Sequence, residues 1–331
     1  MDFTSLLTII ATLFLLLICG FIARKLKIID DTSSKNLSTL IIKIGQPMMI
    51  ISALAEAEFS YDNLAAAGRI VLVGFALHAF MAVIAYLVCR GFPVLDERKI
   101  AEFSLVFTNA GFIGFPIMEA LFGPQGLFLA SFYVISFHIF LWTWGIAILA
   151  RKRDDIKLTV KKVFINFGTV PCFIGILVYL LAIPFSGFVM PEFILKFLKY
   201  LSNLCTPISV LVTGALLANR SPKQILGNLK PFNKVGKKIM VMPLPAMLLV
   251  KLIVMPMIVC VILALTPLDS QTVLFCTTMA ALPSAATITM LSEMYSLDSE
   301  FAAQTVGVSS LLCVGTIPLI LMLAEKIVAI L

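Results

Sequence analysis

Long apolar runs separated by short polar breaks dominate this chain. A helix needs about 20 apolar residues to cross the hydrocarbon core of a bilayer, and ten runs approach that length. They cover residues 3–23, 37–54, 64–89, 100–122, 127–150, 163–183, 193–218, 239–265, 272–291 and 302–324. None alternates strictly over ten residues, as the strands of a membrane β-barrel do. The pattern therefore predicts an all-α polytopic membrane protein with ten transmembrane helices.

The composition is typical of a membrane protein, and the ten segments leave few residues for a separate soluble domain. Apolar residues make up 60% of the chain and charged residues 13%, against about 45–50% and about 25% in soluble domains. The first segment follows Asp2 rather than a basic region, and Arg24 and Lys25 come directly after it. Because no small-residue cleavage site appears there, we expect this segment to stay in the mature protein.

Basic residues are concentrated in alternate loops, which predicts the orientation. Most of the 25 Lys and Arg residues follow the first, third, fifth and seventh segments, whereas the opposite loops and the tail hold Lys196, Lys199 and Lys326. Loops rich in Lys and Arg remain in the cytoplasm. We therefore expect a multi-pass protein of the inner (plasma) membrane with both termini outside. This asymmetry accounts for the net charge of +7, so the sequence does not predict a nucleic-acid partner.

The two halves of the chain share features in the same order. Pro47 in the second segment and Pro207 in the seventh lie at the same depth, and the fourth and ninth segments contain Pro116 and Pro283. Each half has five segments, an odd number, so the halves would face opposite ways. The sequence thus predicts inverted repeats at 1–150 and 163–331, joined by a basic cytoplasmic loop at 151–162. Inverted repeats are typical of secondary transporters.

The fourth and ninth segments are interrupted near their middles. Proline removes a helix hydrogen bond, and Gly111 and Gly114 permit non-helical angles in the stretch 108–116. We predict two broken helices whose inner amino ends, with their partial positive charge, would suit a small anion. Ser284 is expected to cap the second half-helix of segment nine. In the alternative interpretation, both prolines merely kink continuous helices.

The stretch Thr108-Asn109-Ala-Gly111-Phe-Ile-Gly114-Phe-Pro116 resembles the auxin efflux carrier family, which includes bacterial relatives of the plant PIN-type carriers. Residues 121–123 and 281–286 add to this resemblance, which covers essentially the whole chain. It implies a scaffold of helices 1, 2, 6 and 7 that often dimerises. It also implies a transport unit of helices 3–5 and 8–10 that moves like an elevator. The implied substrates are organic anions such as malate, malonate or indole-3-acetate.

The resemblance also implies where the substrate binds. Asn109 matches an asparagine at which helices 4 and 9 of the family cross and which helps to bind a carboxylate. Many relatives have a second asparagine soon after the proline of helix 9, whereas this chain has Ala285, Ala286 and Thr287. Recognition from that side would fall to a hydroxyl group. The predicted substrate-binding residues are Asn109, Thr108, Gly111, Gly114, Ser284, Thr287, Gln46 and Lys43, with Pro116 and Pro283 at the crossover.

Ionisable residues inside the segments are costly and are therefore functional candidates. Lys43 either faces the crossover and neutralises a carboxylate or extends its ammonium to the cytoplasmic interface. Lys251 lies deeper, and we expect it to pair with a carbonyl or an acidic group. Glu119 and His138 are candidates for proton coupling, although each also fits an ordinary structural role.

Other chemistries find little support in the sequence. The cysteines are scattered singly without metal-ligand spacing, and neither clustered catalytic groups nor a phosphate-binding loop appears. We therefore predict no enzyme, no metal and no cofactor, with transport running on an existing proton or sodium gradient. A sodium-coupled symporter of the bile-acid type and a cation/proton antiporter remain alternatives, although the antiporter would call for aspartates beside the breaks.

Overall fold

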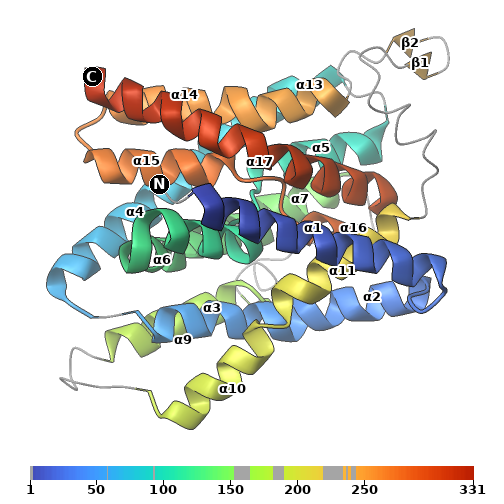
Figure 1. Cartoon of the computed structure of the whole chain (residues 1–331), viewed down its shortest axis with the longest axis horizontal. Coiled ribbons are helices and arrows are strands. Elements are labelled where there is room, and N and C mark those ends of the chain that lie inside the picture. Colours follow the sequence, from blue (N-terminus) through green and yellow to red (C-terminus); the bar gives the residue numbers. More distant parts are fainter. Residues whose placement is uncertain are drawn as a thin grey trace.

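The computed structural model describes residues 3–57, 59–91, 94–152, 165–181, 190–218, 234–235, 238–239 and 244–331. Figure 1 shows an assembly of helices with the short β1–β2 hairpin at its edge. Of the predicted basic loop 151–162, only residues 151–152 lie among those described.

The first half of the chain contains these elements in order: α1 (Phe3–Lys25), α2 (Asp31–Leu40), the π-helix η1 (Ile41–Gly45), α3 (Gln46–Ala55), α4 (Tyr61–Val88), the 3₁₀ turn η2 (Cys89–Gly91), α5 (Leu95–Val106), the π-helix η3 (Ala110–Gly114), α6 (Phe115–Phe140), the π-helix η4 (Leu141–Gly145) and α7 (Ile146–Leu149). The second half contains α9 (Thr169–Leu180), α10 (Glu192–Ser202), α11 (Cys205–Leu217), β1 (Lys234–Val235), β2 (Lys238–Ile239), α13 (Leu244–Leu249), the π-helix η5 (Val250–Val254), α14 (Met255–Ala264), α15 (Ser270–Ala281), α16 (Thr287–Met294) and α17 (Ser299–Ile330).

The predicted helical membrane protein is confirmed at this coarse level. Among the described residues, six helical stretches are long and apolar enough to cross a membrane. They are Asp31–Ala55, Tyr61–Val88, Ile117–Leu149, Glu192–Leu217, Leu244–Ala264 and Ser299–Ile330, and the shorter α9 is also apolar. The arrangement of ten spans in two inverted repeats stays a prediction.

One of these stretches bends sharply. Within α6, Gly123 has φ +65° and ψ −155°, angles outside the helical region, so the chain turns there and resumes a helix at Pro124. Glycine adopts a positive φ without the steric penalty that other residues pay. The turn lies just after the predicted end of the fourth segment at residue 122, as the Gly123-Pro124 pair would suggest.

Three π-helical turns end two residues before a proline. Pro47 and Pro256 lie in the first turns of α3 and α14, which follow η1 and η5. At these junctions the N–H groups of Gln46 and Met255 donate to carbonyls five residues back. A wider turn accommodates the missing N–H and the bulk of the proline ring. These two segments therefore stay helical. In contrast, η3 before Pro116 follows a residue with non-helical backbone angles, Asn109, where the helix is interrupted.

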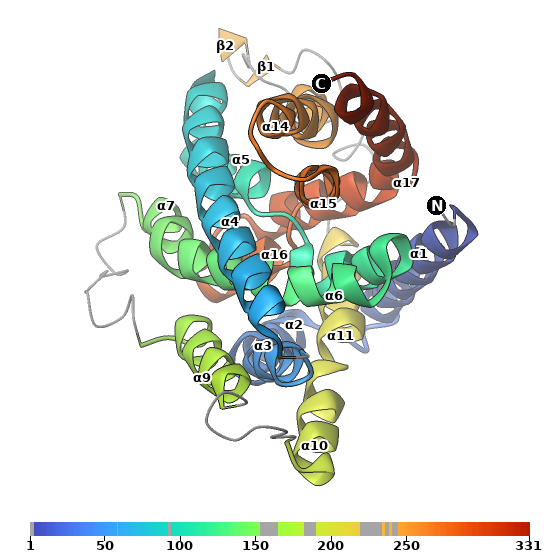
Figure 2. The same ribbon diagram turned by 90° about the vertical axis from the view of Figure 1, so that its left-hand side faces the viewer.

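The helices form two groups with the interrupted segments between them. Helix α1 packs along α11, α3 packs on α9 and α10, and α11 also contacts α2. On the other side, α15 packs on both α14 and α17. Figure 2 shows α14, α15 and α17 together at one side with α5 beside them, α3, α9 and α10 at the other side, and α6 and α16 between.

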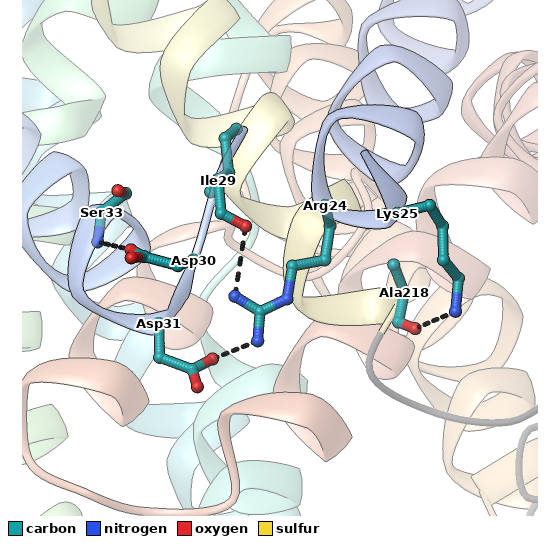
Figure 3. A network of polar contacts seen from close by, with 7 residues as sticks. All are labelled: Arg24, Lys25, Ile29, Asp30, Asp31, Ser33 and Ala218. Atoms are coloured by element: carbon teal, nitrogen blue, oxygen red, sulfur yellow. Dashed lines mark hydrogen bonds and ion pairs between the residues drawn. The ribbon is translucent and has the colours of Figure 1, made fainter. Parts of the chain in front are cut away.

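A polar network fixes the turn that follows α1 (Figure 3). Arg24 donates to the Ile29 carbonyl at 3.2 Å and pairs with Asp31, while the Lys25 ammonium donates to the Ala218 carbonyl at 3.0 Å at the end of α11. Asp30 caps α2 by accepting the Ser33 N–H at 2.7 Å. This bond holds the pKa of the Asp30 carboxyl below its usual value. The network ties the end of α1 to the start of α2 and the end of α11.

Candidate functional site

The two interrupted segments meet at their breaks. Helix α5 ends at Val106 and α15 at Ala281, and between them Thr108 and Ser284 form an isolated antiparallel bridge. The Asn109 N–H donates to the Pro283 carbonyl at 2.8 Å, and the Ala285 N–H donates to the Phe107 carbonyl at 2.9 Å. Buried backbone groups need hydrogen-bond partners. Here the backbone groups of each interrupted segment find their partners in the other segment. We call the paired stretches 107–109 and 283–285 the crossing.

Two half-helices begin at the crossing. The Asn109 carbonyl accepts the N–H groups of Ile113 at 3.1 Å and Gly114 at 2.9 Å, so the helical path toward α6 starts at this residue. On the other strand, α16 begins at Thr287. Both amino ends therefore lie beside the crossing, and the amino end of a helix carries partial positive charge.

The expectation that Ser284 caps α16 is wrong. The cap residue is Ala286, which makes no side-chain cap hydrogen bond. Ser284 lies in the extended bridge, where its N–H donates to the Ser309 hydroxyl at 3.1 Å and its own hydroxyl donates to the Ser104 carbonyl at 3.3 Å. Ser284 lies in this bridge rather than at the start of α16, and its two hydrogen bonds connect the crossing to α5 and α17.

A small cavity of about 10 Å³, lined by both polar and apolar residues, lies against the crossing. That volume is roughly enough for one water molecule. The cavity is lined by Gln46, Met49, Thr108, Asn109, Ala110, Gly111, Phe137, His138, Ala285 and Thr287. Six of the predicted site residues are thus brought together, from α3, the first break, α6 and α16: Gln46, Thr108, Asn109, Gly111, His138 and Thr287.

Several polar atoms around this cavity have no hydrogen-bond partner among the described residues. They are Gln46 Oε1, Thr108 Oγ1 and both ring nitrogens of His138, and all are buried. Leaving a buried polar group unpaired costs about 1–3 kcal/mol. Such groups gathered around one cavity indicate a place for a polar molecule rather than part of the apolar core.

A larger cavity of about 590 Å³ is lined by residues of α3, α6 and α10, among others. Its lining includes Glu119, Asn203 and Lys199, whose ammonium lies 3.0 Å from Glu56. Met49 lines both this cavity and the small one. A Cβ atom at Gly111 would come within 2.6 Å of the Met49 terminal methyl, so the Met49 side chain packs directly against the backbone at Gly111. We call the larger cavity the vestibule.

Asn109 also lines a mainly apolar cavity of about 30 Å³ on its other side. Leu13 and Leu17 of α1, Val210 of α11 and Val306 of α17 contribute to this lining. Asn109 thus lines both a cavity with several polar residues and a mainly apolar one.

The remaining predicted residues lie elsewhere. Lys43 is exposed, with its ammonium 5.7 Å from the centre of the Phe167 ring, and does not line the cavity at the crossing. Glu119 is exposed in the vestibule. Gly114 faces Leu282, whose methyl would lie 2.9 Å from a Cβ added there. The break at Pro283 forms one strand of the crossing, and Pro116 lies in the first turn of α6.

Sequence reasoning missed Met49 and Phe137 as residues lining the cavity. Both read as ordinary apolar positions of a membrane helix. Met49 lies two residues after Pro47, but nothing in that spacing indicates that its side chain reaches the fourth segment.

Comparison with known proteins assigns the family. The profile of a family described as membrane transport protein matches residues 5–321. An uncharacterized transporter of Methanocaldococcus jannaschii is 26% identical over 65% of this chain and 70% of its own length. An uncharacterized transporter of Methanothermobacter thermautotrophicus is 23% identical over 94% of this chain and 96% of its own length. With its membrane-spanning helices and paired helix breaks, this chain belongs to the membrane transport protein family of the auxin efflux carriers.

Proposed function

We propose that the chain is a secondary transporter of small organic anions and that the substrate binds at the crossing. The observation that carries this proposal is the cavity there, which collects unpartnered buried polar atoms beside two half-helix amino ends. Partial positive charge and free N–H groups favour a carboxylate.

The carboxylate and the hydrocarbon part of the anion would bind in the two different cavities that Asn109 lines. Its amide NH₂ would donate to the carboxylate, with the hydroxyls of Thr108 and Thr287 and the amide of Gln46 as further partners in the polar cavity. The apolar cavity toward α1 and α17 would accept the hydrocarbon part. Because the cavities are small in this conformation, the site would have to widen as the substrate enters.

Access would alternate by movement of one helix group against the other. The vestibule is lined by Ser52 and Lys199 from the α3 and α10 group and by Glu119 and Gln125 from α6. We propose that α1–α3 and α9–α11 form the scaffold, which also joins two copies of the chain. In this view α4–α7 and α13–α17 form the moving unit. On the predicted topology the vestibule opens to the outside of the inner membrane.

The test is uptake and counterflow of labelled malate, malonate and indole-3-acetate in proteoliposomes with imposed proton or sodium gradients. We expect saturable movement of at least one acid, and its dependence on one gradient would identify the coupling ion. If none of the acids moves in protein that elutes as a single folded species, the carboxylate assignment is wrong. Movement of a cation instead would favour the antiporter.

Replacing Asn109 with alanine is expected to weaken substrate binding at least tenfold without loss of folded protein. The change removes an amide that would donate to a carboxylate, and a hydrogen bond to a charged group contributes about 1.5–3 kcal/mol. The apparent affinity in counterflow provides the measurement. The matched control is Asn36→Ala, on an exposed face of α2 far along the chain from the crossing. Equal affinity in the wild type and Asn109→Ala would exclude the amide from the site.

A further inference from the structure

Lys251 is fully buried in η5, before Pro256. Its ammonium donates to the Leu105 carbonyl at 3.0 Å. A buried charge requires partners, and the partner of this one among the described residues is a carbonyl rather than a carboxylate. A protonated Lys251 would therefore bring to the interior a positive charge with which no carboxylate of the described residues pairs.

That carbonyl belongs to the last turn of α5, directly before the crossing. The last four carbonyls of a helix lack partners within it, and together they carry partial negative charge. Ser284 donates its hydroxyl to the Ser104 carbonyl, and Ala285 donates its N–H to the Phe107 carbonyl. Three groups from the second half of the chain thus cap this end of α5, and Lys251 is the charged one among them.

We propose that Lys251 is the fixed counter-charge of the transport site. Its ammonium neutralises the carbonyl end of α5 and offsets the charge of an anion at Asn109, four residues after the carbonyl that Lys251 binds. Lys251 and α5 both belong to the proposed moving unit, so the ammonium and a monovalent anion cross the membrane together without net charge. This inference rests on the proposed function. Because Lys251 supplies a positive charge at the carboxyl end of α5, no cation from solution is needed there.

The first experiment measures exchange of a labelled monocarboxylate against the same unlabelled acid across proteoliposomes held at different membrane potentials. Under these exchange conditions, the measured rate reports only the movement of the substrate-loaded unit across the membrane. The wild type is expected to exchange at the same rate at 0 and 100 mV. In Lys251→Met, which keeps most of the length of the side chain and removes its charge, the loaded unit carries a full negative charge. A full charge crossing the whole field responds about tenfold for each ~60 mV, so we expect exchange to fall more than threefold at 100 mV. Lys251→Arg keeps the charge and should behave like the wild type.

A wild-type exchange rate that falls with potential as steeply as that of Lys251→Met would overturn the proposal, as would a Lys251→Met rate that ignores the potential. The wild-type measurement decides by itself if the methionine variant does not fold.

A second experiment uses no substrate. Lys251→Ala leaves both a space and an uncapped helix end, and its thermal midpoint in detergent is expected to fall by several degrees. Ethylammonium should restore the midpoint in a saturable way, whereas the neutral molecule ethanol should not. Equal responses to the two molecules would show that the side chain only fills space. Failure of every acid to move would count against the proposed function, whereas the ethylammonium response would still decide whether Lys251 caps α5.

Discussion

Replacing Gly214 with leucine is expected to prevent the protein from accumulating in folded form. A Cβ atom at Gly214 of α11 would overlap the Leu17 carbonyl of α1, and one at Gly20 of α1 would overlap the Leu211 carbonyl of α11. Helices in lipid associate through such close backbone contact between small residues. A leucine would force α1 and α11 apart over their whole contact, beyond the roughly 1–3 kcal/mol of ordinary overpacking.

The measurement is the fraction of monodisperse protein after detergent extraction, followed by fluorescence-detected size-exclusion chromatography. Gly315→Leu is the matched control, because nothing lies within 4 Å of a Cβ atom at that position of α17. We expect the control to elute like the wild type. A Gly214→Leu protein with the same yield and elution would mean that α1 and α11 do not need this close approach.

The second large effect is expected from Glu102→Gln. The Glu102 carboxylate is fully buried and accepts hydrogen bonds from Arg98 at 2.7 Å and from both terminal nitrogens of Arg151 at 3.0 and 2.7 Å. Removing one member of a buried ion pair costs about 3–5 kcal/mol. Because the two arginine side chains are 22% and 32% exposed, water screens part of their charge. We therefore expect a loss of about 2–3 kcal/mol.

Thermal unfolding in detergent would show this loss as a lower midpoint. Glu192→Gln provides the comparison, since it breaks a pair with Lys196 whose two side chains are largely exposed, and exposed pairs contribute about 0–1 kcal/mol. If both variants unfold at the wild-type midpoint, the link that Glu102 makes between α5 and the chain after α7 does not stabilise the fold.

The positions of the two breaks could be predicted from the sequence, but their exact form could not. Glycines and prolines within apolar segments indicated interruptions near Pro116 and Pro283. The first break lies at residues 107–109, before the proline, and the π-helical turn η3 carries the helical path from Asn109 to Pro116 in α6. Pro47 also lies within an apolar segment, yet that segment stays helical, because a π-helical turn accommodates the proline.

The candidate site was predicted in part for a similar reason. Asn109, Thr108 and Thr287 adjoin the breaks, so local sequence and the family resemblance were enough to single them out. Met49 and Phe137 line the same cavity only because of how α3 and α6 pack against the crossing, and this packing leaves no local trace in the sequence. For Lys43 the sequence left two orientations open, and the structure has it exposed and outside the lining of the cavity at the crossing.

The crossing also constrains the order in which the protein can be made. The carbonyl of Phe107 and the N–H of Asn109 find their partners at Ala285 and Pro283, near the other end of the chain. Unpaired backbone groups cost several kcal/mol each in lipid. During synthesis, the fourth segment must therefore wait in a hydrated or protein-bound environment until the ninth segment emerges from the ribosome. A nascent chain that stops before residue 283 contains every residue of the first break but cannot bury it, so the insertion machinery must hold this segment until nearly the whole chain has been translated.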